Sequence, residues 1–137
     1  MKSRKWAKLL CLVIAGVVIT GCSVRQEPKD KLRDLEFSVL DEKDIPAPLM
    51  EVIQKNLKTE MKLSYQKDGE LYLARGFGEQ ETGGYSIAVT QVYLAEDGIH
   101  GKFQLIGPDR GEKLTETPSY PYVVIQMEDL GKSIHFE

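Results

Sequence analysis

The sequence predicts an α+β fold that is mostly β, with one N-terminal amphipathic helix and about six antiparallel strands in hairpins that form a sheet or small sandwich. Apolar and polar residues alternate in short runs through most of the chain after residue 34, which is typical of half-buried strands. Asp68-Gly69 and Asp97-Gly98 each stand between two such runs, as hairpin turns do. Only one stretch has apolar residues at helical spacing, which limits the α content.

That helical stretch follows an acidic turn and two prolines. Leu49, Ile53 and Leu57 recur every four residues, while charged and amide side chains take the other side. Prolines suit the first turn of a helix, and Asp44 is the expected N-cap. We expect the apolar stripe to pack against the core of the domain.

The strand predictions differ in character. The apolar phase of residues 85–95 shifts after Val89, which indicates a β-bulge or a strand buried on both faces. Residues 99–105 alternate cleanly, like an edge strand, whereas residues 120–127 are nearly all apolar and fit a central strand. Pro121 belongs at the start of that strand, because it cannot donate to a ladder. The predicted strands are 35–39, 61–65, 71–77, 85–95, 99–105, 120–127 and 133–136.

The N-terminus resembles a bacterial lipoprotein signal. Four basic residues precede the uncharged apolar run 9–20, which is short for a transmembrane helix and ends in Thr20-Gly21-Cys22. This lipobox-like pattern predicts cleavage before Cys22 and lipidation of its thiol; the alternative is an uncleaved membrane anchor. The predicted parts are a signal peptide (1–21), lipidated Cys22 with a polar tether (22–33) and a β-rich domain (34–137).

Charge and cysteine content limit the partners of the exported chain. Loss of the four basic residues of the signal from 18 Lys+Arg leaves 14 against 21 Asp+Glu, a formal charge of −7. This balance disfavours a nucleic-acid partner and a basic patch on anionic lipid. We expect the protein to be held on the outer face of the bacterial cell membrane by the lipid on Cys22. Cys11 leaves with the signal, so the domain has no disulfide.

The sequence shows no recognisable catalytic or cofactor site. His100 and His135 are interpreted as solvated surface histidines, and no ligand set with zinc or calcium spacing accompanies them. Ser86 and Ser119 lack a nucleophile elbow and a histidine partner. The glycine-rich stretch 76–84 precedes a strand rather than a helix, so it is not a phosphate cradle. We therefore expect no enzyme activity, no metal and no cofactor.

Two motifs resemble the PrcB C-terminal domain family. Gly78-Glu79-Gln80-Glu81-Thr82-Gly83-Gly84-Tyr85-Ser86 is similar to the signature Gly-Glu-x-x-Thr-Gly-Gly-Tyr-Ser, and residues 118–124 are similar to a Tyr-Pro-Tyr strand start. The resemblance extends over about residues 71–127. The family takes its name from a subunit that associates with a secreted subtilisin-like protease and supports its stability. The resemblance thus implies a non-catalytic protein-binding or assembly module.

Other functions stay open from the sequence alone. A chagasin-like protease inhibitor also has a Thr-Gly-Tyr loop on a β scaffold, and a purely structural envelope lipoprotein or a small ligand carrier are further alternatives. The candidate residues either bind a partner or shape the loop. In the second case the motif tyrosines form an aromatic corner of the core, with Tyr85 near the other two. The candidates are Thr82, Gly83, Gly84, Tyr85, Ser86, Tyr120, Pro121 and Tyr122.

Overall fold

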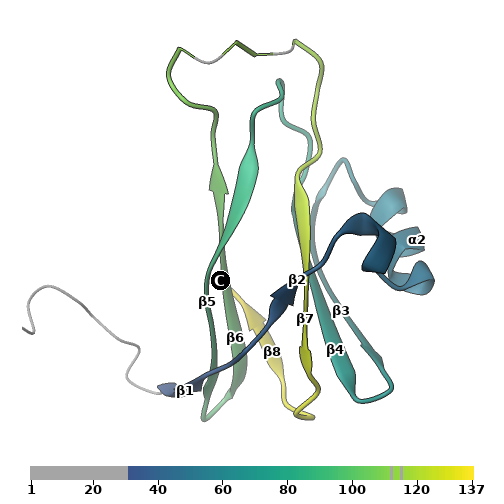
Figure 1. Cartoon of the computed structure of the whole chain (residues 1–137), viewed down its shortest axis with the longest axis vertical. Coiled ribbons are helices and arrows are strands. Elements are labelled where there is room, and N and C mark those ends of the chain that lie inside the picture. Colours follow the sequence, from purple (N-terminus) through teal and green to yellow (C-terminus); the bar gives the residue numbers. More distant parts are fainter. Residues whose placement is uncertain (1–30, 112, 115) are drawn as a thin grey trace, which may run out of the picture. The chain divides into compact units, whose positions relative to one another are not determined.

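Eight strands form two four-stranded sheets in the part of the chain that the computed structural model describes, residues 31–111, 113–114 and 116–137. One sheet has the order β1-β5-β6-β8 and the other β2-β7-β4-β3 (Figure 1). The predicted signal peptide (1–21) and Cys22 lie outside the described residues. The elements are β1 (Lys31–Asp34), β2 (Ser38–Val39), the 3-10 turn η1 (Glu42–Asp44), α2 (Ala47–Lys55), β3 (Glu60–Lys67), β4 (Glu70–Phe77), β5 (Ser86–Ala95), β6 (Gly98–Ile106), β7 (Tyr122–Glu128) and β8 (Ile134–Phe136).

The two sheets enclose the larger of two apolar clusters. Along β4, Leu71 and Leu73 point into this core and are at most 1% exposed, as the period of two in a strand requires. Ile125 contributes from β7, and Val92 and Ile99 contribute from the facing sheet. The fold is therefore a mostly β sandwich, which confirms the sandwich alternative of the sequence prediction. The buried members of this cluster are Leu35, Leu71, Leu73, Val92, Ile99, Phe103, Ile125 and Met127.

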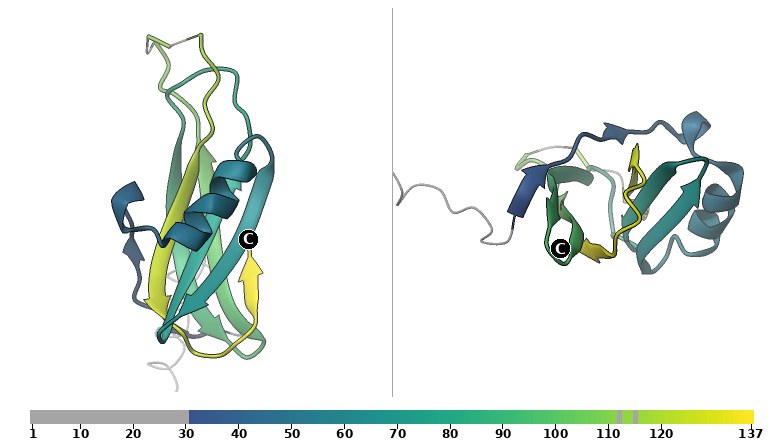
Figure 2. Two further views of the ribbon diagram at one scale, coloured as in Figure 1. Left: turned by 90° about the vertical axis from the view of Figure 1, so that its right-hand side faces the viewer. Right: turned by 90° about the horizontal axis from the view of Figure 1, so that it is seen from below.

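A second cluster lies on the outer face of the β2-β7-β4-β3 sheet, under α2 (Figure 2). Leu49 and Ile53 of the helix are buried there against Ala74 and Val124 of the sheet, so the predicted apolar stripe does face the core. The predicted cap is wrong. Asp44 belongs to η1, and Pro46 occupies the N-cap position of α2 without a side-chain hydrogen bond. A proline there has no side-chain acceptor, so the helix depends on its buried face.

The start of the domain differs from the predicted single strand 35–39. The chain instead runs through β1, crosses at Leu35 and Phe37, and continues as β2 in the other sheet. The Leu35 amide donates to the Val92 carbonyl at 2.9 Å and the Leu40 amide donates to the Val124 carbonyl at 2.9 Å, so this crossing segment is bonded to both sheets. β1 begins at Lys31, inside the segment predicted as the tether.

Both predicted hairpin turns are present. Asp68 and Gly69 have φ values of 51° and 80°, the two positive angles of a type I′ turn, and they join β3 to β4. Asp97 and Gly98 lie at the turn between β5 and β6. The β5–β6 register shifts between Val89 and Gln91, which confirms the predicted bulge.

The prediction that residues 99–105 form an edge strand is wrong. β6 lies between β5 and β8, because the last strand returns parallel to it. That pairing also corrects the expectation of antiparallel strands only. The alternating pattern misled because His100 was assigned to a polar face, although its side chain is 15% exposed and it pairs with His135 of β8.

Candidate functional site

The two sequence motifs meet at one end of the sandwich, where the β4–β5 and β6–β7 connections run side by side (Figure 1). Gln80 and Ser119 form an isolated antiparallel bridge with N···O distances of 2.8 and 3.0 Å. The Ser119 hydroxyl donates to the Thr82 carbonyl at 2.6 Å. This bond from a side-chain hydroxyl to a carbonyl joins positions 37 residues apart in the chain, beside the backbone bridge. Ser119 has a structural use that its residue type alone did not reveal.

The start of β7 is fixed in the same way. The Phe77 amide donates to the Pro121 carbonyl at 3.2 Å, and Tyr122 pairs with Gly76 in the ladder. Pro121 stands immediately before β7, where its missing N–H leaves no gap in the ladder, as the sequence predicted.

The glycine loop is shaped at particular positions. The Thr82 hydroxyl donates to the Gly83 carbonyl at 3.1 Å, and Gly84 has φ 87°, a left-handed conformation that favours glycine. Gly83 is not among the described residues with positive φ, so in the pair Gly83-Gly84 the left-handed conformation falls on Gly84. Gly78 has φ 76°, and a Cβ there would lie 3.2 Å from the Lys58 carbonyl oxygen. Ser86 follows the loop as the first residue of β5.

The predicted aromatic corner does not form. Tyr85 precedes β5, whereas Tyr120 and Tyr122 lie at the start of β7, and β5 and β7 belong to different sheets. The Tyr85 ring lies about 3.7 Å from where a Cβ on Gly107 would stand. Among the described residues, no ring contact joins Tyr85 to the other two tyrosines.

Tyr120 lies between two adjoining cavities. One, of about 330 Å³, is formed with residues 54–59 at the end of α2, and the other, of about 320 Å³, with residues 39–45 and 121–124. The Tyr120 hydroxyl donates to Glu79 Oε1 at 3.0 Å. That bond to the Glu79 carboxylate raises the pKa of Tyr120 above its usual value. A tyrosine held at its hydroxyl, with its ring between two hollows, is a surface suited to contact with apolar side chains.

Tyr122 occupies the deeper position. Its hydroxyl donates to Glu42 Oε1 at 3.1 Å and its ring packs against the α2 cluster beside Met50. Burial, followed by the Glu42 carboxylate, raises the pKa of Tyr122 to about 12. The two tyrosines of the motif therefore differ, because one belongs to the core under α2 and the other to the surface.

The edge of β7 is partly open beside these cavities. β2 pairs only with Ile125 and Gln126, and the Leu40 amide bonds to Val124. Within the described residues, no strand pairs with Tyr122 or Val123 on that side. Unpaired stretches of a strand edge are where an extended segment of another chain can add to a sheet.

A larger cavity, about 880 Å³, lies elsewhere. It runs along the crossing segment, residues 33–38, and the end of β7. Its lining includes Asp34, Glu36, Glu70 and Glu128 but none of the motif residues, so it is a separate acidic groove.

Both histidines lie near the opposite end of the sandwich, around the β5–β6 turn. The interpretation of His100 as a solvated residue is wrong: its side chain is 15% exposed, and its ring stacks between those of Tyr93 and His135. Its ring nitrogens bond to Asp97 and Glu137. Burial lowers the pKa of His100, but the two carboxylates outweigh this effect and raise it overall. Sequence spacing hid this group, since its members are separated by up to 40 positions.

Comparison with known proteins gives a match in the part of the chain that carries the two motifs. Residues 71–128, from β4 to β7, match the family model described as PrcB C-terminal. This segment is a PrcB C-terminal domain. It contains both motif segments and β4, β5, β6 and β7, the four strands that contribute buried residues to the larger apolar cluster. No curated protein and no solved structure matches the chain. In the part of the chain that the structure describes, no helix has the length and apolar character needed to cross a membrane.

Proposed function

We propose that this protein is an exported, lipid-anchored and non-catalytic module that binds another protein through the surface around Tyr120. The observation that carries the proposal is the position of Tyr120 between two cavities, beside an open stretch of the β7 edge. Tyr120 and the β7 edge lie in the segment that matches the PrcB C-terminal family, and the other cavity walls come from residues before it. Its backbone edge offers hydrogen bonds and its cavities offer side-chain pockets, the combination used when an extended segment adds to a sheet.

The proposed partner is a secreted protease of the subtilisin-like class, which the protein stabilises or helps to assemble. The test measures binding of such a protease, encoded in the same genome, to the full chain in detergent. We expect Tyr120→Ala to weaken binding by about 10-fold or more, as loss of a central aromatic anchor does. Tyr65→Ala, which removes a ring on the outer strand of the same sheet, is the matched control and should leave binding unchanged.

The effect on the protease separates this proposal from inhibition. A longer half-life of the protease on heating, with peptide cleavage unaffected, supports a stabilising subunit. Loss of peptide cleavage on addition of the protein would instead favour an inhibitor. Equal binding by the wild type and the Tyr120→Ala variant would overturn the proposed surface.

Membrane attachment is proposed to depend on a lipid on Cys22. Cys22→Ser should release the protein from the membrane fraction and abolish labelling with a tagged fatty acid. Cys11→Ser is the control, because that residue lies in the apolar run of the predicted signal and should have no effect on labelling. Labelling of the Cys22→Ser variant at the wild-type level would contradict the attachment site.

A further inference from the structure

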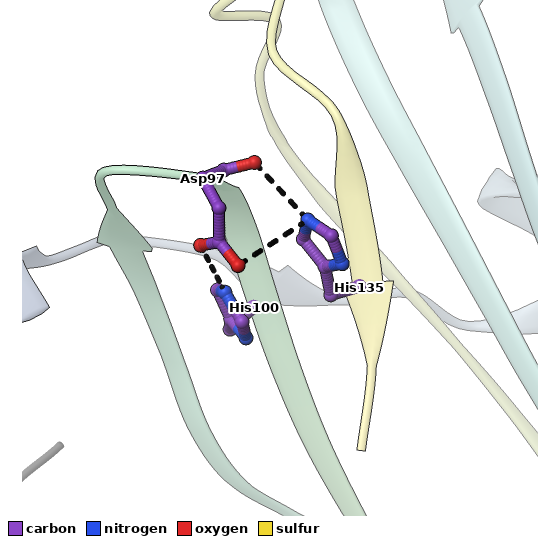
Figure 3. A group of neighbouring side chains, drawn as sticks. All are labelled: Asp97, His100 and His135. Atoms are coloured by element: carbon purple, nitrogen blue, oxygen red, sulfur yellow. Dashed lines mark hydrogen bonds and ion pairs between the residues drawn. The ribbon is translucent and has the colours of Figure 1, made fainter. Parts of the chain in front are cut away.

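Three side chains with metal-ligating atoms converge near the β5–β6 turn. One donor atom from each of Asp97, His100 and His135 lies within 4.8 Å of the others. Asp97 Oδ1 is 2.6 Å from His100 Nε2, and Asp97 Oδ2 is 3.8 Å from His135 Nε2 (Figure 3). The Asp97 carboxylate therefore faces the Nε2 atom of each imidazole.

The fold itself holds the two histidines together. His100 of β6 and His135 of β8 are direct partners in the parallel ladder, so their side chains leave the sheet on the same face. The Ile99 amide donates to the Ser133 carbonyl at 2.7 Å, which fixes β8 against the turn that carries Asp97. Strand register, rather than a flexible loop, brings the imidazoles side by side.

A further carboxylate orients His100 from behind. Glu137 Oε2 bonds to His100 Nδ1, and the Tyr93 hydroxyl donates to the same oxygen at 3.3 Å. Histidines that bind metals usually donate their other N–H to a carboxylate in this way. The nitrogen that would face the ion is then His100 Nε2, which in this structure contacts Asp97 Oδ1. Lys102 Nζ lies 3.8 Å from the other Glu137 oxygen and helps to hold that carboxylate in place.

We propose that Asp97, His100 and His135 bind a divalent transition-metal ion, with Zn²⁺ as the ion to test. Two imidazoles and one carboxylate form a ligand set that zinc accepts, with water in the fourth position. Asp97 is 60% exposed and His135 41%, so ion and water have access. Imidazole ligands favour this class of ion over Mg²⁺ or Ca²⁺, which take oxygen ligands.

Binding requires a rearrangement of the three side chains. Ligand atoms around Zn²⁺ stand roughly 3.4 Å apart, given bonds of about 2.1 Å in a tetrahedron. The 2.6 Å contact between Asp97 Oδ1 and His100 Nε2 must therefore lengthen, whereas the 3.8 Å between Asp97 Oδ2 and His135 Nε2 must shorten, and the exposed Asp97 and half-exposed His135 side chains allow these movements. The ion would link β8, a strand of three residues, to the β5–β6 hairpin.

Calorimetric titration of Zn²⁺ into the full chain in detergent, purified with a tag free of histidine, tests the site. We expect one ion per chain, with affinity lowered about 100-fold or more by Asp97→Asn or His135→Ala. Glu137→Gln should lower it about 10- to 100-fold, as loss of an orienting carboxylate does. Glu96→Gln removes the same charge from the neighbouring exposed position and should leave the affinity unchanged.

A second measurement keeps the test independent of folding defects. Zn²⁺ should raise the unfolding temperature of the wild type and of Glu96→Gln but not of Asp97→Asn, because an ion that binds the folded state stabilises it. Asp97 is exposed and its amide retains a hydrogen-bonding oxygen, so this variant is expected to fold. No binding by the wild type, or equal binding by Asp97→Asn, would show that the three side chains form only an ion-paired cluster.

Discussion

The two ends of the sandwich bring their residues together in different ways, and the difference explains why one group could be recognised in the sequence and the other could not. At one end, two motifs that are recognisable in the chain meet through backbone bonds between residues 80–82 and 119. At the other end, Asp97, His100, His135 and Glu137 carry no shared motif and meet only through the register of β6 with β8. The first kind of site is visible as local composition, whereas the second appears only when strand pairing is known.

A glycine substitution at each end provides the strongest test of this contrast. Gly98 has φ 136°, and a Cβ there would lie 2.3 Å from the Ser133 carbonyl oxygen. Gly98→Ala must push β8 away, so we expect a loss of about 3 kcal/mol in the free energy of unfolding. Gly78→Ala, with a closest backbone atom at 3.2 Å, should cost about 1–2 kcal/mol. Urea unfolding gives both values.

Gly69→Ala is the control for this pair. Gly69 has φ 80° but nothing within 4 Å of an added Cβ, so only backbone strain of about 1 kcal/mol remains. Equal losses in the free energy of unfolding for Gly98→Ala and Gly69→Ala would mean that β8 shifts to accommodate the added methyl group at no cost in stability. In that case the register holding the histidines is weaker than the hydrogen bonds indicate.

The two motif tyrosines should differ in their effect on stability. Tyr122→Ala removes a ring that packs against the α2 cluster and should lower the free energy of unfolding by about 2–3 kcal/mol. Tyr120→Ala should lower it by less than about 1 kcal/mol, because its hydroxyl bond to Glu79 is at the surface. Thermal unfolding of both variants measures this. A larger loss of unfolding free energy for Tyr120→Ala than for Tyr122→Ala would show that the Tyr120 ring belongs to the core and not to the binding surface.

Alkaline titration should show the smallest effect. The pKa of Tyr122 is about 12, above the value of about 10 for an unfolded tyrosine. The fold therefore favours the protonated phenol, so its contribution to stability is complete below pH 10 and is lost as the pH rises towards 12. The ultraviolet absorbance of tyrosinate should show a late ionisation step near pH 12 from Tyr122. Tyr122→Phe should remove that late step, and its persistence would assign it to another tyrosine.

Much of the fold could be predicted because its cause is local. Asp68-Gly69 fixes a turn through positive φ, and the apolar stripe of α2 follows from spacing alone. The bulge near Val89 left a phase shift in the sequence. The parallel return of β8 left no such trace, since three residues have no distinctive period, and the prediction for β6 failed with it.

The sequence predicted which residues belong to the candidate site better than it predicted how those residues are arranged. The motif identified Thr82, Gly84 and Tyr120, but the hydrogen-bond partners Glu42 and Glu79 came from outside the predicted set. The expected closeness of Tyr85 to the other tyrosines failed because it assumed that β5 and β7 are neighbours. Strand order depends on long-range packing, which the pattern of a single strand does not contain.

The crossing segment would have a mechanical consequence under the lipid anchoring proposed at Cys22. A pull on the chain before Lys31 reaches β1 first, and β1, at the edge of one sheet, pairs with β5 through Lys31, Arg33 and Asp34. The chain then passes through Leu35, a member of the larger apolar cluster, to β2 on the other sheet. Force that strips β1 therefore next loads Leu35 and then a strand on the opposite sheet, next to the open edge of β7. Tension on the proposed anchor would thus reach both the core, at Leu35, and the strand beside the proposed binding surface.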